Sequence, residues 1–221
     1  MKTPCLFLLL AAAAMAADTP GLKPKFEATG YPAHAQAPGA NVGARLLTPE
    51  QVRGAFSTDL NRGYVVVEVA VYPQDGDQLD LGPGDFTLRL EGTDISARPA
   101  APKTIAQVLS KAASGDRDID VYPTVGVGYE SGRGYDPMYG GRGGWTTGAG
   151  VGVGVGRPRG ASTEADRKTM ALELGDQQLP EKMITAPVAG YLYFPLAAKN
   201  KRATYILEYQ GQAGRASLTL H

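Results

Sequence analysis

Two groups of aspartates have the residue type and spacing to bind a cation. One group is Asp75, Asp77 and Asp80, and the other is Asp116, Asp118 and Asp120. Calcium prefers several carboxylate oxygens within one tight loop. In the first group, however, Leu79 takes the place of a third ligand and no glutamate closes the site. Aspartate and glycine are also usual in ordinary turns, so we predict no metal site and no cofactor.

Histidine and cysteine, which serve most nucleophilic and zinc sites, are scarce. The chain has His34, His221 and a single cysteine, Cys5. A Ser-His-Asp triad needs a histidine held by packing and by a second partner, and neither position offers that. The sequence motifs of zinc proteases and serine hydrolases are missing too. We therefore predict that the protein is not an enzyme and has no catalytic residue.

A glycine-rich segment, residues 124–160, carries the aromatic candidates for a binding surface. Fourteen of the 29 glycines lie there, together with Tyr129, Tyr135, Tyr139 and Trp145. Tyr and Trp combine a large contact area with one polar atom, which suits protein interfaces and sugar platforms. These four residues are the candidate partner contacts, with another protein or a cell-surface polysaccharide as partner. Folding back of the aromatic rings onto their own domain is the alternative.

Two conformations fit this segment. Its glycine content leaves few apolar groups to bury, which predicts a flexible loop. The alternation of Val and Gly in residues 125–128 and 148–156 instead predicts two strands that pair as a hairpin, with residues 130–147 at its tip. A phosphate-binding loop is not predicted, because no Lys-Ser or Lys-Thr pair follows the glycines.

Charge and hydropathy limit the partners and the location. The 22 basic and 22 acidic residues balance, so no overall field attracts nucleic acid. Residues 1–16 have the pattern of a secretory signal peptide, with Lys2, an apolar run over residues 6–14, and Ala14-Met15-Ala16 as cleavage site. That run is shorter than the roughly 20 residues of a membrane-spanning helix. We expect an exported protein in the periplasm, at the cell surface or in the medium, without a membrane span.

The remaining patterns predict the elements that position these residues. Residues 17–46, rich in Pro, Gly and Ala, predict an extended or disordered arm, and residues 47–221 one domain that contains the glycine-rich insertion. Residues 64–72 alternate with apolar groups on both faces, which indicates a central strand. Further strands are predicted at residues 86–91, 188–196, 203–209 and 216–220, the last two as a hairpin.

Three segments predict helices. Thr48, Pro49 and Gln51 form a capping pattern for a helix that ends near Phe56. Residues 102–113 place apolar side chains on one helical face. Residues 163–174 form a charged helix, with Thr163 and Asp166 as a capping box at its start, that Gly175 should end.

The strand sequences resemble a known kind of domain. The similar stretches are Gly63-Tyr64-Val65-Val66-Val67-Glu68-Val69, Asp85-Phe86-Thr87-Leu88 and Pro187-Val188-Ala189-Gly190-Tyr191-Leu192-Tyr193-Phe194-Pro195. They look like strands of secreted bacterial immunoglobulin-like β-sandwich domains of unknown function. The resemblance implies a mainly β fold: an antiparallel immunoglobulin-like β-sandwich with two or three short peripheral helices and a Gly-rich hairpin or loop insertion. It brings no catalytic residue with it.

These patterns together predict an exported, non-enzymatic binding or structural module that contacts a macromolecular partner. The contact would use the glycine-rich segment or an exposed sheet edge. Two alternatives stay open, a carbohydrate-binding accessory module and a carboxylate-dependent hydrolase. The hydrolase requires two carboxylates about 5 to 10 Å apart across a concave pocket, whereas the binding module requires an exposed aromatic or apolar patch.

Overall fold

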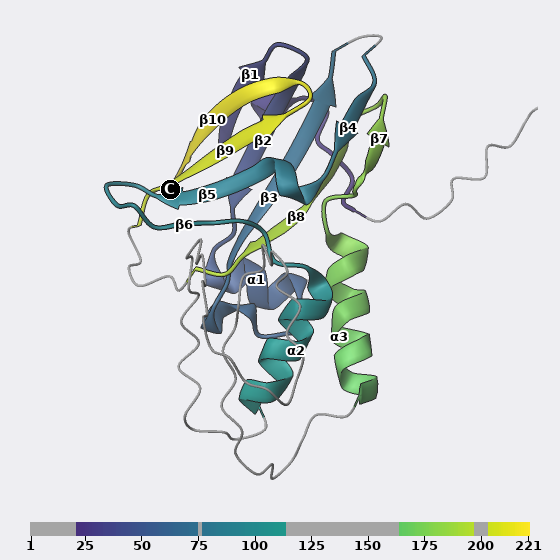
Figure 1. Cartoon of the computed structure of the whole chain (residues 1–221), viewed down its shortest axis with the longest axis vertical. Coiled ribbons are helices and arrows are strands. Elements are labelled where there is room, and N and C mark those ends of the chain that lie inside the picture. Colours follow the sequence, from purple (N-terminus) through teal and green to yellow (C-terminus); the bar gives the residue numbers. More distant parts are fainter. Residues whose placement is uncertain (1–20, 75–76, 114–163, 197–202) are drawn as a thin grey trace, which may run out of the picture.

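The computed structural model describes residues 21–74, 77–113, 164–196 and 203–221 (Figure 1). These described residues form ten strands: β1 (Ala33–Ala37), β2 (Ala40–Leu46), β3 (Val65–Pro73), β4 (Leu79–Leu81), β5 (Phe86–Leu90), β6 (Ser96–Ala97), β7 (Lys182–Ile184), β8 (Val188–Phe194), β9 (Tyr205–Gly211) and β10 (Gly214–Leu220). They also form the helices α1 (Pro49–Ala55), α2 (Pro102–Ala113) and α3 (Glu164–Gln177), and the short 3-10 helices η1 (Ala28–Gly30), η2 (Leu60–Arg62) and η3 (Pro83–Asp85).

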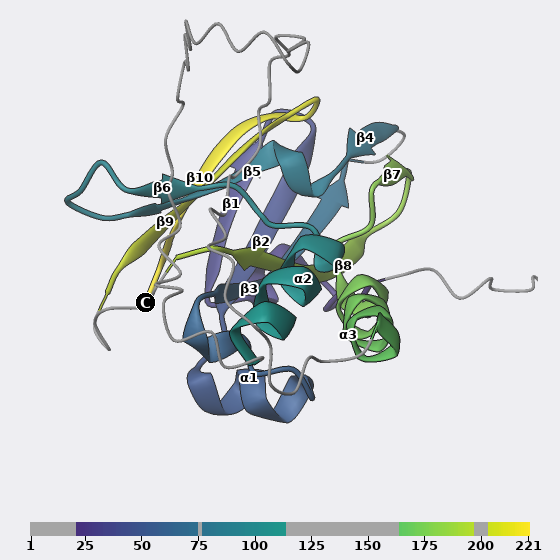
Figure 2. The same ribbon diagram turned by 60° about the horizontal axis from the view of Figure 1, so that its bottom comes forward.

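The described strands pair antiparallel in three sheets. The first sheet has the order β1-β2-β3-β8, the second β10-β9-β5-β6, and a small third sheet pairs β4 with β7. Figure 2 shows the second sheet as a layer over the first. Their facing sides meet in one apolar core, which includes Val42, Val67, Val69, Phe86, Leu88, Leu207 and Leu218. The predicted mainly β, antiparallel fold is confirmed at this level.

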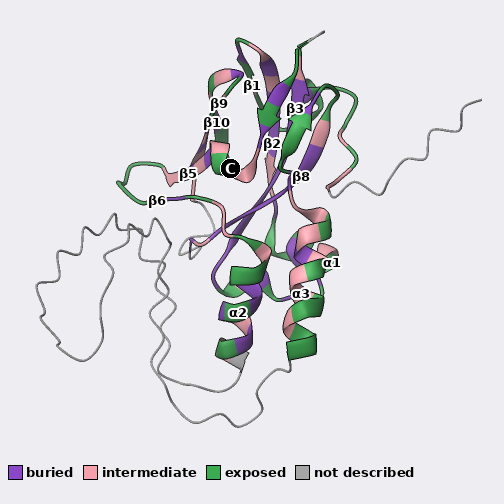
Figure 3. Ribbon diagram, turned by 45° about the vertical axis from the view of Figure 1, so that its right-hand side comes forward, coloured by how far each residue is buried: buried purple, intermediate pink, exposed green. Residues whose placement is uncertain are grey.

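Strand β3 is central and buried on both faces, as its alternation predicts. Val65, Val67, Val69 and Val71 face the core between the two sheets. On the other face, Val66 packs under the helices, and Ala70 packs under the segment of residues 22–31. Figure 3 shows the burial of the central strands and the exposed outer faces of α2 and α3.

The helices gather at one end of the sheets (Figure 1). Helix α1 has the predicted capping box: Gln51 N–H donates to Thr48 Oγ1 at 3.3 Å, and Thr48 N–H donates to Gln51 Oε1 at 2.9 Å. Phe56, which follows the helix, packs edge-on against the rings of Tyr191 and Tyr193 at 5.2 and 5.8 Å between centroids. The predicted bounds of α2 are confirmed.

Helix α3 continues to Gln177, so the prediction that Gly175 ends it is wrong. Tertiary contacts extend it: Tyr193 O–H donates to the Leu174 carbonyl at 2.9 Å, and Gly21 N–H donates to the Asp176 carbonyl at 2.8 Å. The buried Leu174 side chain adds apolar contact. These contacts outweigh the cost of about 1 kcal/mol for glycine inside a helix. Thr163, the predicted cap, lies outside the described residues.

A carboxylate ties α3 to the segment after α1. Glu173 accepts hydrogen bonds from Ser57 N–H at 2.6 Å, Ser57 Oγ–H at 2.8 Å and Thr58 Oγ1–H at 2.8 Å. Burial by itself would raise the pKa of Glu173, but these donors outweigh burial and lower the pKa. The ionised carboxylate therefore holds α3 on the domain at neutral pH.

The prediction of an arm over residues 17–46 is wrong for residues 33–46. These residues form the β1–β2 hairpin of the first sheet, in register with β3. Their small side chains carry a weak hydrophobic signal, yet Ala40, Val42 and Ala44 are fully buried where the two sheets meet. The alternation of alanines at positions 33, 35 and 37 before Pro38-Gly39 was the signal that could have predicted this hairpin.

The other domain predictions stay predictions. The signal peptide, residues 1–16, and the glycine-rich insertion, residues 124–160, lie outside the described residues. Strands on the two sides of residues 114–163 do share sheets, since β3 pairs with β8 and β5 pairs with β9.

Gly190 in β8 gives a test of how closely Leu179 packs on the edge of the first sheet. A Cβ atom at Gly190 would lie 2.2 Å from the backbone nitrogen of Leu179, whereas one at Gly175 would meet nothing within 4 Å. We expect Gly190→Ala to lower the free energy of unfolding by about 1–3 kcal/mol or more, the cost of overpacking. The control Gly175→Ala should raise it by about 0.5–1 kcal/mol, because alanine is the better helix former. Urea unfolding of both variants measures this, and an unchanged Gly190→Ala would contradict the packing.

Candidate functional site

The structure separates the residues that the sequence singles out. Tyr129, Tyr135, Tyr139 and Trp145 lie outside the described residues, so their role as partner contacts stays a prediction. Asp75 and the group Asp116, Asp118 and Asp120 lie outside as well. Within the described residues, His34 and His221 are exposed, and no group of three or more His, Cys, Asp or Glu side chains could hold a metal ion.

A short turn on the outer face of the first sheet presents an aromatic side chain to solvent. The turn comprises residues 25–30 and is called the Lys25 turn below. Its Phe26 side chain is 99% exposed, whereas the other large apolar side chains that are exposed in the described residues reach at most 56%. Burying such a ring against a partner would remove its apolar surface from water, which is favourable.

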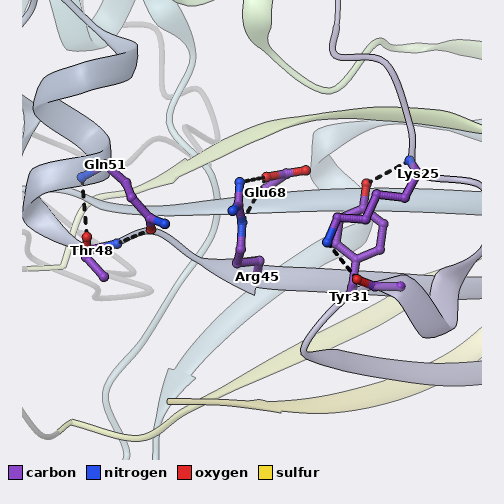
Figure 4. Close-up of polar contacts among 7 residues, drawn as sticks. Lys25, Tyr31, Arg45, Thr48, Gln51 and Glu68 are labelled. Carbon is purple, nitrogen blue, oxygen red and sulfur yellow. Dashed lines mark hydrogen bonds and ion pairs between the residues drawn. The ribbon is translucent and has the colours of Figure 1, made fainter.

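Hydrogen bonds at both ends hold the Lys25 turn in place (Figure 4). Lys25 N–H donates to the Tyr31 hydroxyl at 3.4 Å, and Lys25 Nζ donates to the Gly30 carbonyl at 2.6 Å. Tyr72 O–H donates to the Lys25 carbonyl at 2.9 Å, which ties the turn to β3. The Lys25 ammonium also lies 4.5 Å from the centre of the Tyr31 ring, a cation–π distance. Phe26 is therefore exposed on an anchored backbone.

Small residues in the sheet make room for this anchor. Gly43, Ala70 and Ala189 lie side by side across β2, β3 and β8. A Cβ atom at Gly43 would lie 2.5 Å from the Tyr31 ring, so the ring occupies the space that a larger residue would fill. Tyr31 is only 2% exposed as a result. The small side chains of the sheet thus leave the space that the Tyr31 ring, next to the turn, occupies.

The next row across the sheet holds an ion pair whose carboxylate is buried and whose arginine is half-buried. Arg45, Glu68 and Tyr191 lie side by side on β2, β3 and β8. Arg45 Nε donates to Glu68 Oε2 at 3.1 Å, and Arg45 Nη2 contacts the same oxygen (Figure 4). The Glu68 side chain is 8% exposed and that of Arg45 is 35% exposed. A carboxylate this deeply buried needs such a partner.

The tyrosines around Glu68 stay protonated at neutral pH. Burial raises the pKa of Tyr31, Tyr72 and Tyr191, and the negative charge of Glu68 raises each of them further. A phenol with a raised pKa donates a hydrogen bond but is a poor base or nucleophile. At the Lys25 turn, the Tyr72 hydroxyl donates to the Lys25 carbonyl and the Tyr31 hydroxyl accepts from Lys25 N–H, so these two hydroxyls are suited to holding the turn in place, not to catalysis.

A second group of carboxylates lies near the small sheet. The pKa of Asp85 is raised, chiefly by burial. Gly82 N–H donates to Asp85 Oδ2 at 3.0 Å, which lowers this pKa, and the negative charges of Asp80 and Glu181 raise it again. A shallow pocket of about 260 Å³ lies nearby, lined by Pro83, Gly175, Gln178, Leu179, Pro180, Glu181 and Lys182. Glu181 lines this pocket but Asp85 does not, because the Asp85 carboxylate closes the turn of η3. This pocket therefore lacks the facing carboxylate pair that a hydrolase requires.

Comparisons with known proteins do not define a family for the chain. No protein-family model matches it, and no curated protein matches it. It is similar to a putative lipoprotein from Bacillus subtilis, known from a crystal structure, with 14% sequence identity and a TM-score of 0.38. The match covers 84% of this chain and 37% of the other, so this chain spans little more than a third of that protein. None of the described helices is long and apolar enough to cross a membrane.

Sequence reasoning missed the Lys25 turn, because residues 17–46 looked like an arm. The available signal was Phe26 between two charged residues, Lys25 and Glu27, in a segment with little else that is apolar. Whether such a ring is buried or exposed depends on the fold that surrounds it, which is not encoded locally.

The ion pair yields a stability test. We expect Arg45→Met to lower the free energy of unfolding by roughly 3 kcal/mol, since it leaves the Glu68 carboxylate buried without its partner. The double variant Arg45→Met, Glu68→Leu should recover most of that loss. As a control, Arg62→Met breaks the exposed pair with Asp59 and should cost less than about 1 kcal/mol. Urea unfolding measures all three, and a single Arg45→Met as stable as the wild type would contradict the dependence of the buried Glu68 carboxylate on Arg45.

The raised pKa of Asp85 yields a pH test. Because the folded-state pKa lies above the unfolded value, ionisation of Asp85 disfavours the folded state. Asp85→Asn removes the charge and keeps an oxygen that accepts the Gly82 N–H. We expect this variant to melt at a higher temperature than the wild type at pH 7, with the difference vanishing below the ordinary aspartate pKa of about 3.9. Thermal melts from pH 3 to 7 check this; a variant that is less stable by the same amount at every pH would refute it.

Proposed function

We propose that the protein is a binding module without catalytic activity, and that it contacts a macromolecular partner through Phe26 on the Lys25 turn. The observation that carries this proposal is the full exposure of the Phe26 ring on an anchored backbone. Aromatic residues dominate the energetics of many interfaces. Covering one such ring is worth about 1.5–3 kcal/mol.

The anchoring of the turn supports the proposal by a second argument. A flexible loop loses conformational entropy when it binds, and this loss offsets part of the contact energy. Here the hydrogen bonds of Lys25 to Tyr31 and Gly30, and that of Tyr72 to Lys25, fix the turn before any partner arrives. The contact energy of Phe26 would therefore go largely into affinity.

The buried ionisable groups near the two candidate sites, Glu68, the tyrosines around it and Asp85, favour binding over catalysis. A general base or nucleophile needs a pKa near the working pH and access to substrate. Glu68 is buried against Arg45, the tyrosines around it have raised pKa values, and Asp85 closes a turn. Each of these groups has a structural task, which leaves the hydrolase alternative without a candidate pair among them.

We also infer that the likeness to immunoglobulin-like domains extends to the two-sheet architecture only. Constant-type immunoglobulin domains place their first, second, fourth and fifth strands in one sheet. Here the strands β1, β2 and β3 follow one another in a single sheet before the chain crosses to the second. We propose in addition that the protein is exported. We also propose that four aromatic residues contribute to the partner contact, namely Tyr129, Tyr135, Tyr139 and Trp145.

A carbohydrate-binding accessory module is the second candidate. An exposed aromatic ring on a rigid turn is the platform that stacks against the apolar face of a sugar ring. The same two variants test both candidates. One assay measures binding to a polysaccharide, and a second assay measures binding to a protein partner.

The test replaces Phe26 and uses an exposed apolar residue elsewhere as control. Phe26→Ala removes the ring, and Leu172→Ala removes a side chain that is 56% exposed on α3. Both sites are exposed, so the melting temperatures should match that of the wild type. Binding to insoluble peptidoglycan and chitin is measured by co-sedimentation. For a protein partner, a photo-crosslinking amino acid is placed at position 26 or 172 in the full chain, and the crosslinked protein is then purified for titration.

We expect Phe26→Ala to raise the Kd about 30-fold for the probe that binds, the loss of one interface hot spot. Leu172→Ala should bind as the wild type does. Equal binding by both variants, or a crosslink that forms at position 172 as readily as at position 26, would overturn the proposal.

A further inference from the structure

Three hydrogen-bonding side chains share the outer face of the β1–β2 hairpin, namely His34, Gln36 and Asn41. They are called the polar strip below. Their neighbours Ala35 and Val42 pack into the core between the sheets, so the polar strip faces away from that core. His34 and Gln36 are exposed, and Asn41 is half-buried. Within the described residues these three side chains make no hydrogen bond or ion pair, so their donors and acceptors are available to a ligand.

The strand register places the polar strip beside the Lys25 turn. His34 lies opposite Gly43 in the sheet, and the Tyr31 ring fills the space that a side chain at Gly43 would occupy. Asn41 lies opposite Tyr72, whose hydroxyl donates to a carbonyl of the turn at 2.9 Å. Both ends of the polar strip therefore border residues that hold the turn, and the strip and the turn form one continuous face.

The chemistry of the polar strip suits a ligand that is rich in hydroxyl groups. The amides of Gln36 and Asn41 each have two N–H donors and an acceptor oxygen, and a neutral imidazole has one donor and one acceptor. Gln36 lies directly opposite Asn41, where Cβ atoms are about 5 Å apart. His34 is two residues from Gln36, about 7 Å along the strand. An extended molecule with hydroxyls along its length can therefore bond to all three side chains.

Phe26 supplies the apolar part of this face. The other large apolar side chains that are exposed in the described residues lie on other elements: Ile95 in the turn after β5, Leu172 on α3 and Met183 on β7. A protein interface has an apolar core of several side chains, which this face lacks. One aromatic ring beside hydrogen-bonding groups instead matches a sugar, which has an apolar C–H face and a rim of hydroxyls.

We propose, on the basis of the carbohydrate-binding candidate of the proposed function, that the polar strip and Phe26 form one binding site for a neutral polysaccharide. Phe26 stacks against the C–H face of one sugar, and the side chains of the polar strip bond to hydroxyls of the neighbouring sugars. The β1–β2 hairpin is held in register with β3. The site is thus formed before the ligand arrives, which limits the entropy lost on binding.

The first test measures co-sedimentation of the full chain with chitin and with cellulose, two neutral polysaccharides. Gln36→Ala and Asn41→Ala each remove one amide and should raise the Kd about fivefold, the contribution of one or two hydrogen bonds. The matched control Gln210→Ala removes an exposed amide from the outer face of the second sheet and should bind as the wild type does. Melting temperatures show that each variant is folded.

A soluble chitin oligosaccharide gives a second readout. Titration followed by ¹H–¹⁵N spectra should shift the side-chain amide signals of Gln36 and Asn41 and leave those of Gln210 in place. Because the ligand is neutral, its Kd should stay constant between about 0.1 and 1 M NaCl.

The outcomes separate this site from the proposed function. Absence of binding to both polysaccharides would overturn the site, and so would Gln36→Ala and Asn41→Ala variants that bind as the wild type does while Phe26→Ala binds weakly. Neither result contradicts a protein contact through Phe26, because the crosslink from position 26 tests that contact separately. A Kd that rises steeply with salt would show a charged ligand and would also overturn the site. Equal binding by Phe26→Ala and the wild type would overturn the proposed function and this site with it.

Discussion

Burial of β3 on both faces is the constraint on which the rest of the structure depends. A strand with apolar side chains on both faces needs cover on both, and one face of β3 meets the second sheet. The helices α1, α2 and α3 cover only part of the other face of β3, because they gather at one end of the sheets. The segment of residues 22–31 covers the remainder. The outer face of β3 thus has two covers, with Glu68 between them.

The position of Glu68 links stability to the proposed site. A buried carboxylate is tolerated only when a charge and hydrogen bonds compensate for the lost water. Arg45 supplies the charge, and it belongs to β2. Burial, and in addition the negative charge of Glu68, raise the pKa of the Tyr31 and Tyr72 hydroxyls. Those hydroxyls in turn hold the Lys25 turn, so the arrangement that packs the central strand also fixes the backbone that exposes Phe26.

Features encoded by neighbouring residues could be predicted from the sequence, and features that depend on distant contacts could not. The alternation in β3 and the Thr48–Gln51 capping box are local, and the structure has both. The β1–β2 hairpin has only small side chains to signal it, and its stability comes from packing on β3. Helix α3 passes Gly175 because Tyr193 and Gly21 bond to its last turns. The exposure of Phe26 likewise depends on Tyr72, far along the chain.

The central claim is that the Lys25 turn is rigid while its Phe26 ring is exposed. Backbone ¹⁵N relaxation of the full chain measures this directly, because order parameters report motion on the picosecond to nanosecond timescale. The structure predicts values of about 0.85 for residues 25–30, those of a rigid backbone. Values below about 0.6 would describe a flexible loop and would contradict the anchoring of the turn by Tyr31 and Tyr72.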